Sequence, residues 1–378
     1  MPLGLPDLRD GLTPCGRRML LATLKAEASS DPDTVNTYKA LHAAWDGDHA
    51  QSFDELFAQL LRLTQPWVCR YPLIEPGGYF GSVDGATASP AYYTRVQLTR
   101  IGRMLVGATP HATLEDPGVL PSSFPQLLCN GALAHTGVID LDCESANDPG
   151  PEPPAAYYRV PTGRMVGGKL EAFLPPHHLG RVCEGLVYMA DHPGAQLGQM
   201  LPIIRGPDFP TGGLLMNPED LERIYAEGEG VLKLRARTKV TKDSDGNDIL
   251  VIQELPYGVT TGELLPWLIR EGAVDVGVTR PENDPAGYRV QIRVKADPAG
   301  SALEDMSWTV LKRETKVRLA VVCDGKAEVV TLLQLMKWHL ESMRKLLGLR
   351  SDNQGRLHEE LRRWIEQGDN PRTEISMP

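Results

Sequence analysis

The sequence has few cysteines, no long apolar run and a deficit of basic residues, and each shortage excludes a class of protein. Its six cysteines are scattered without a Cys-x-x-Cys pair, which argues against a disulfide framework or zinc site and fits a reducing compartment. No run approaches about eighteen apolar residues, so no transmembrane helix is predicted. The start, MPLGLPDLRDG, lacks the basic and apolar segments of a signal peptide.

Charge argues mildly against a general nucleic-acid binder. The chain has 39 Lys and Arg against 49 Asp and Glu, a formal net charge of −10. Its 378 residues, 42% apolar and 23% charged, are typical of a soluble globular protein of two or three domains. The 31 prolines and 37 glycines divide it into short elements. Only the local distribution of charge can therefore identify a binding surface.

The first part of the chain predicts three short helices. One begins at Pro14, a second covers 35–45, and a third begins at Ser52 with Glu55 completing a capping box and ends at Pro66. Strand-like sequence follows over 71–82, an order that suits a winged-helix module.

A glycine-rich loop and a tyrosine-bearing segment come next. The loop, 74–90, could bring backbone close to a phosphate, but it lacks a P-loop lysine and does not match G-x-G-x-x-G, so a nucleotide site is not favoured. Residues 91–105, AYYTRVQLTRIGRML, are predicted to form a helix that carries Tyr92, Tyr93 and Arg95.

The stretch 230–256 is the most informative for binding. Apolar side chains alternate with Lys233, Arg235 and Arg237, which predicts a strand with one basic face. Asp245-Gly246 predicts a hairpin turn, and ILVIQEL is the return strand. A second basic-faced strand is predicted over 288–296. One such strand is typical of a solvated face, but two in an acidic protein favour a polyanion-binding surface.

Two further segments complete the organisation. Residues 144–165 are rich in proline and acid and are interpreted as an exposed insertion. The preceding Asp140, Asp142 and Glu144 could resemble a magnesium site, but an acidic strand end is favoured. Two helices with apolar stripes are predicted over 328–366.

Several motifs in order resemble the A, or breakage-reunion, subunit of bacterial type IIA DNA topoisomerases, DNA gyrase and topoisomerase IV. Residues 5–20 resemble LPDxRDGLKPVHRR, 77–85 resemble GNFGSxDG, and 91–98 resemble RYTExRL, which carries the family's catalytic tyrosine. FPQLLCNG, LPPHHL, GPDFPTGG, RARTKV and ELPYGV follow in the family's order. The resemblance spans roughly residues 4 to 345.

The resemblance implies an α+β fold: a winged-helix DNA-cleavage domain over 1–125, a tower domain with antiparallel strands over 126–322, and a short C-terminal helical segment over 323–378. It implies that Tyr93 is the nucleophile that forms a phosphotyrosyl link to DNA, with Arg17 assisting catalysis. Arg95 is a further catalytic candidate from the residues themselves, because it lies three residues after Tyr92 and could turn toward the site on the same face of the predicted helix. The residues implied to bind DNA are Arg17, Arg18, His49, Thr94, Lys233, Arg235 and Arg237.

The resemblance also implies partners. No cofactor or metal ligand is predicted on this chain; Mg²⁺ and ATP would be held by a separate ATPase and metal-binding B-type subunit. Double-stranded DNA would be bound by a homodimer, with no membrane. The expected location is the cytoplasm, at the nucleoid, and a phage or plasmid origin is plausible from the compact form.

The sequence departs from the family at the cleavage site. Tyr92 stands where the family has an arginine before its tyrosine, and loss of one such donor typically lowers the rate on the order of a hundredfold. Of the family's HPHG segment only His49 remains, and the Lys and His of KPVHRR become Thr13 and Gly16. Two alternatives therefore stand beside the enzyme: a catalytically weakened DNA-binding or decoy protein of the same fold, and an unrelated protein with chance matches.

Overall fold

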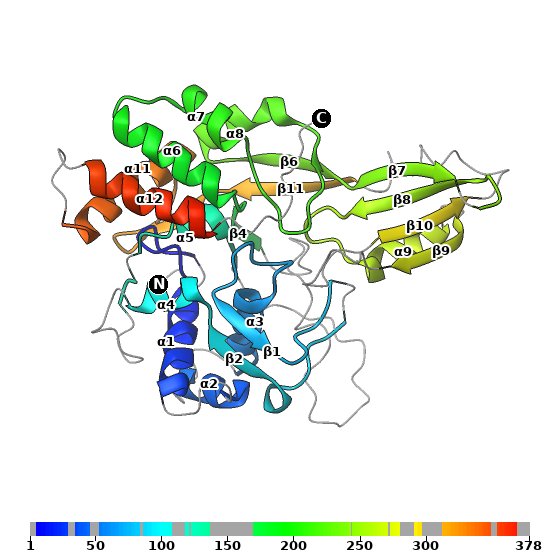
Figure 1. Cartoon of the computed structure of the whole chain (residues 1–378), viewed down its shortest axis with the longest axis horizontal. Coiled ribbons are helices and arrows are strands. Elements are labelled where there is room, and N and C mark those ends of the chain that lie inside the picture. Colours follow the sequence, from blue (N-terminus) through cyan, green and yellow to red (C-terminus); the bar gives the residue numbers. More distant parts are fainter. Residues whose placement is uncertain are drawn as a thin grey trace.

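The computed structural model describes residues 5–28, 35–45, 53–83, 86–107, 118–120, 122–136, 169–242, 244–270, 273–279, 291–296, 312–348 and 354–368. Its elements form three groups (Figure 1). The N-terminal module contains α1–α4, β1 and β2; the central body contains a five-stranded sheet with α5–α8, α11 and α12; the arm contains a four-stranded sheet with α9. This mixture of helices and antiparallel sheets confirms the predicted α+β class.

The N-terminal module begins with the three predicted helices. They are α1 (Pro14–Ala28), α2 (Thr37–Ala44) and α3 (Phe53–Thr64). Their apolar stripes pack against one another and against β1 (Ile74–Gly77), β2 (Arg95–Leu98) and α4 (Arg100–Gly107) in one hydrophobic cluster. Asn36 caps α2, because its side chain accepts a hydrogen bond from the backbone N–H of Tyr38 at 2.9 Å. The predicted cap Ser52 lies outside the described residues.

The predicted helix over 91–105 is wrong. The segment is a 3₁₀ turn over Ala91–Tyr93, then strand β2, and only then helix α4. β2 pairs antiparallel with β1, and Val96 and Leu98 point into the core while Arg95 is exposed. Alternation over four residues is too short to reveal a strand whose partner lies about twenty residues earlier in the chain.

The central body holds the largest hydrophobic cluster. Its helices are α5 (Gln126–Asn130), α6 (Leu179–Asp191), α7 (Leu197–Ile204), α8 (Leu221–Glu227), α11 (Leu332–Leu346) and α12 (Gln354–Gly368). The sheet has the order β3 (Ala132–Thr136), β4 (Lys169–Leu174), β11 (Lys312–Arg318), β6 (Glu229–Arg235), β5 (Leu214–Leu215). A separate hairpin joins β12 (Ala320–Cys323) to β13 (Lys326–Val329).

The two helices predicted near the end of the sequence are confirmed as α11 and α12. Buried Leu357, Leu361 and Trp364 of α12 join the cluster of the central body, where α12 packs against α6. The indole N–H of Trp364 donates to the Ser123 hydroxyl at 3.0 Å. These helices are therefore part of the body that carries the sheet.

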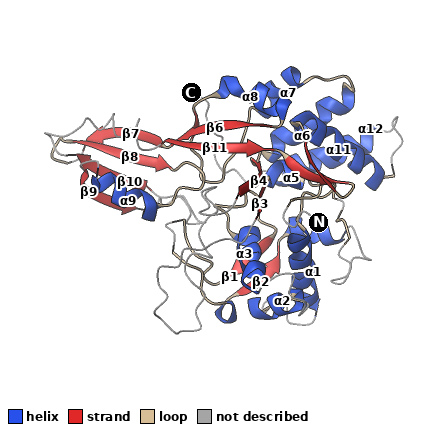
Figure 2. Ribbon diagram, turned by 180° about the vertical axis from the view of Figure 1, so that it is seen from behind, coloured by secondary structure: helices blue, strands red, loops and turns tan. Residues whose placement is uncertain are grey.

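The arm extends from the central body in the direction of β6 and β11 (Figure 2). Its sheet has the order β7 (Arg237–Lys242), β8 (Asp248–Glu254), β10 (Gln291–Ala296), β9 (Ala273–Thr279), with α9 (Thr261–Arg270) beside it. The predicted hairpin is confirmed: β7 and β8 pair antiparallel, and Gly246 in the turn has φ 85°.

The predicted basic-faced strand is two strands in two sheets. β6 ends before Ala236, which is fully buried, and β7 then enters the arm. Leu232 and Leu234 are buried, as the alternation of apolar and basic residues predicts. Val240 is exposed, so the predicted alternation of burial does not continue past Ala236. The predicted insertion over 144–165, including Glu144, and the acidic residues Asp140 and Asp142 lie outside the described residues.

Candidate active site

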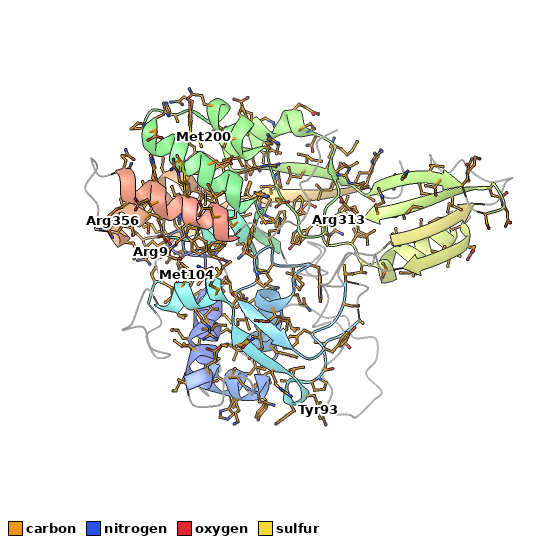
Figure 3. All side chains as sticks on the ribbon, in the orientation of Figure 1. Arg9, Tyr93, Met104, Met200, Arg313 and Arg356 are labelled. Atoms are coloured by element: carbon orange, nitrogen blue, oxygen red, sulfur yellow. The ribbon has the colours of Figure 1, made fainter. Side chains whose placement is uncertain are left out.

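Tyr93 lies in a fixed turn and is open to solvent. It is the last residue of the 3₁₀ turn, and its backbone N–H donates to the Pro90 carbonyl at 2.9 Å. Its side chain is 81% exposed, at the edge of the N-terminal module away from the central body (Figure 3). A phenol in this position can reach an external partner as large as a duplex.

Thr94 holds this turn from beneath. Its side chain is 1% exposed, and its hydroxyl lies 2.8 Å from the Thr37 hydroxyl and 3.3 Å from the Ala91 carbonyl oxygen. The backbone N–H of Thr37 also donates to the Thr94 carbonyl at 3.0 Å. Burial gives the Thr94 side chain a positioning role in this structure, and the contact of Thr94 with DNA stays a prediction.

The glycine-rich loop packs against the same turn. Gly78 has φ 101°, which L side chains rarely adopt, and a Cβ there would lie 3.5 Å from the Tyr93 carbonyl oxygen. The Gln65 side chain donates to the Phe80 carbonyl at 2.7 Å, and the Ser89 N–H donates to the Tyr79 carbonyl at 3.0 Å. The positive φ is therefore what favours glycine at 78, since a Cβ there would make only ordinary contact with the Tyr93 turn.

Tyr92, next to Tyr93, is held by other aromatic residues. Its ring stacks on Tyr38 of α2 with centroids 4.0 Å apart and planes at 19°. A hydrogen bond to Tyr38 raises the pKa of the Tyr92 phenol. The Asn36 side chain donates to the Tyr92 carbonyl at 2.9 Å. Of the two adjacent tyrosines, Tyr92 is held against α2 and Tyr93 is the more exposed.

Arg17 is buried and paired with carboxylates. It is 8% exposed, and its guanidinium contacts Asp10 at 2.6 and 3.0 Å and Asp7 at 3.3 Å. Asp10 also accepts the backbone N–H of Leu12 and of Leu120. Its charge is neutralised inside the module in this structure, and its roles in catalysis and DNA contact stay predictions.

The remaining predicted cations near Tyr93 fall into three cases. Arg18, on α1, is half-buried, and its contact with DNA stays a prediction. Arg95 is exposed on β2 opposite Gly77, so the predicted approach to the site along a shared helix face is wrong. His49 lies outside the described residues.

The two segments that contain Tyr38 and Tyr93 have an excess of basic residues although the chain is acidic, while the neighbouring strand β1 carries an exposed Glu75. Segments 35–45 and 90–107 contain no Asp or Glu, but they contain Lys39, Arg95, Arg100 and Arg103. Arg103 is paired with Glu27. Such a surface suits a polyanion.

Lys233 and Arg235 share one face of the central sheet. In the antiparallel register Arg235 lies opposite Lys312, and Lys233 lies opposite Glu314. Lys316, two residues further along β11, is exposed on the same face. Arg318 and Glu229 lie opposite each other on the same face, which is thus predominantly basic with two carboxylates, Glu314 and Glu229.

Arg237 is separated from that face. It belongs to β7 in the arm, and its guanidinium pairs with Glu254 at 3.0 Å. The same Glu254 oxygen accepts the backbone N–H of Gly213 at 2.8 Å. The prediction of one basic strand face carrying Lys233, Arg235 and Arg237 is therefore wrong for Arg237, which helps join the arm to the central body.

The chain's own described residues do not fit a catalytic metal. Nowhere among them do three His, Cys, Asp or Glu side chains gather closely enough to hold an ion. The five cysteines in the described part are free thiols: Cys15, Cys69, Cys129, Cys183 and Cys323. The helices of that same part include none with the length and apolarity needed to span a bilayer.

Two features bear on the class of this protein: an exposed tyrosine on a helical module, and an antiparallel arm. Both fit a subunit of a DNA topoisomerase, and comparison with known proteins agrees. Residues 4–135 and 166–368 match the family described as the A subunit of DNA gyrase/topoisomerase IV. The chain belongs to this family, so the alternative of an unrelated protein with chance matches is wrong.

Individual relatives give the same result. The chain is 28% identical over 366 residues to the DNA gyrase A subunit of Brachyspira hyodysenteriae, an alignment that covers 92% of this chain and 40% of the relative. It is 28% identical over 367 residues to the corresponding protein from Leptospira biflexa, with the same coverage. It is 30% identical over 306 residues to the corresponding protein from Chlamydia pneumoniae, covering 77% of this chain and 33% of the relative. The chain thus spans about 40% of the length of the first two relatives.

Proposed function

We propose that this chain is the DNA-gate subunit of a type IIA topoisomerase, which cuts and reseals double-stranded DNA through Tyr93. The observation that carries the proposal is the open, fixed position of the Tyr93 phenol beside the Tyr92–Tyr38 pair. The N-terminal module serves as the winged-helix cleavage domain. The central sheet and the arm serve as the tower.

In the proposed reaction the Tyr93 oxygen attacks a backbone phosphorus. A phosphotyrosyl bond forms as the bond from phosphorus to the leaving sugar oxygen breaks, and the phenolic proton is lost to solvent or a base. The freed sugar hydroxyl later attacks the same phosphorus and releases Tyr93, so the energy of the broken bond is conserved. The basic segments around the turn attract the duplex and favour the negative charge of the transition state.

Partners complete the activity. Two copies of the chain act on the two strands as a homodimer, and a separate B-type subunit supplies Mg²⁺ and hydrolyses ATP. The match to proteins named as A subunits of DNA gyrase supports this division between two kinds of subunit. The complex acts on the nucleoid in the cytoplasm.

The test is covalent DNA capture. The protein is mixed with supercoiled plasmid, Mg²⁺ or Mn²⁺ and the ATPase subunit of the same genome, and detergent and protease are then added. We expect nicked and linear DNA carrying peptide, and its loss in Tyr93→Phe. Tyr188→Phe, which removes a hydroxyl from α6 in the central body, is the matched control and retains cleavage. DNA that stays intact under every metal and partner condition contradicts the proposal and supports a non-cleaving DNA-binding protein.

A further inference from the structure

We propose that the open face of the Tyr92 ring is a stacking surface for the nucleobase next to the phosphate that Tyr93 attacks. The inference deepens the proposed DNA cleavage and rests on it. In the family pattern an arginine occupies this position, so an aromatic ring here gives the site a different chemistry: it recognises the face of a base instead of the charge of a phosphate.

The geometry leaves one ring face available. Tyr38 covers one face of Tyr92 at a centroid distance of 4.0 Å, yet Tyr92 remains 61% exposed. A planar ring with one face covered can keep that much exposure only if its opposite face is open to solvent. The open face is large enough for a base to stack upon it.

The ring is also held rigidly. Tyr38 contacts Phe53 of α3 at a centroid distance of 5.5 Å and His42 of α2 at 6.1 Å, so the stack is anchored on two helices. Asn36 fixes the backbone of Tyr92 through its carbonyl. A side chain that is already ordered loses little conformational entropy when it binds, which favours a defined stacking partner.

The surroundings favour nucleic acid as that partner. Tyr92 precedes Tyr93 in the same turn, so a strand whose phosphate reaches Tyr93 brings a base beside Tyr92. Lys39 follows Tyr38 on α2 and is exposed, and neither segment 35–45 nor 90–107 contains an acid. A polyanion with aromatic bases matches both the charge and the open ring.

A base can occupy this surface only when it leaves its normal stack. Bases at a gap or at the end of a broken strand meet this condition at little energetic cost, whereas bases inside an intact duplex do not. Tyr92 therefore selects broken or distorted DNA over intact duplex and retains the cut end while Tyr93 is attached to it.

The test compares two DNA probes and three variants. One probe is a duplex with a one-nucleotide gap and 5-iododeoxyuridine at the base bordering the gap; the other is the same duplex without a gap. Tyr92→Leu is expected to weaken binding to the gapped probe about tenfold, with binding to the intact probe within about twofold. Tyr92→Phe keeps the ring and rescues binding. Trp338→Leu, at an exposed tryptophan on α11, is the matched control.

A second readout reports contact directly. Long-wavelength light attaches iodinated bases to aromatic rings stacked on them, and peptide mass spectrometry should place the attachment on Tyr92. Attachment only elsewhere, or equal binding of both probes by Tyr92→Leu and wild type, overturns the stacking proposal. Neither result depends on cleavage: if Tyr93 forms no covalent DNA link while Tyr92 binds the gapped probe, the proposed function fails and the stacking surface stands.

Discussion

Replacing Arg17 by methionine should destabilise the fold, and this separates a structural arginine from a DNA-contacting one. The Asp10 side chain is completely buried and accepts four hydrogen bonds, two from Arg17 and two from the backbone N–H groups of Leu12 and Leu120. Removing Arg17 leaves a buried carboxylate with half its donors. Breaking a buried pair in this way costs about 3–5 kcal/mol.

The magnitude is testable by a double-mutant cycle. Asp10→Asn combined with Arg17→Met removes both charges, so the double variant should be more stable than Arg17→Met alone. Urea unfolding followed by circular dichroism gives the free energies. Arg18→Met, on the same helix but half-buried, is the control and should change stability by less than about 1 kcal/mol. A variant Arg17→Met as stable as wild type that loses DNA binding would refute the reasoning.

Three further predictions concern other parts of the molecule. Burial lowers the pKa of His177 to about 4; because the unfolded chain binds its proton at the ordinary value of about 6.5, stability should fall by about 3 kcal/mol as the pH drops from about 6.5 to about 4. Thermal unfolding should show a smaller fall in His177→Gln. Thr94→Val should reduce covalent DNA capture about fivefold with plasmid binding retained, since it removes the hydroxyl contact to α2. Lys233→Glu with Lys316→Glu should weaken plasmid binding and make its salt dependence shallower.

Each of these predictions has a contrary result. An unchanged pH profile in His177→Gln would show that this histidine does not govern acid stability. Thr94→Ser keeps the hydroxyl and should retain capture; equal losses in Thr94→Ser and Thr94→Val would remove the hydroxyl from the explanation. Lys337→Glu, an exposed lysine on α11, is the control for the basic sheet face, and equal weakening by this variant would indicate a general charge effect.

The elements that could be predicted from sequence have strong local signals. Helices α1–α3 have apolar stripes at helical spacing, and the β7–β8 hairpin has an Asp-Gly turn between alternating strands. The strand β2 could not be recognised, because RVQL is short and its strand character depends on pairing with β1. The change of sheet at Ala236 was also invisible, since the residue pattern continues across it.

The site residues also divide into those with a local signal in the sequence and those whose position depends on distant parts of the chain. Tyr93 was identified through its surrounding motif, and its exposure agrees with that role. The burial of Arg17 could not be foreseen, because its partner Asp10 lies seven residues earlier and nothing in the sequence reveals the ion pair. The Tyr38–Tyr92 stack joins residues more than fifty positions apart, so only the folded chain shows it. Asn36 had a signal, a helix-capping residue before a helical stretch.

Tyr93 is tested as the nucleophile most directly by locating the attached nucleotide on the protein. Covalent complexes are formed with plasmid in the presence of the ATPase partner and trimmed with nuclease, and the peptide containing both adjacent tyrosines is sequenced by fragmentation in the mass spectrometer. We expect a nucleotide attached to the oxygen of Tyr93. A nucleotide attached to Tyr92 instead, or to any residue outside this turn, would contradict this expectation.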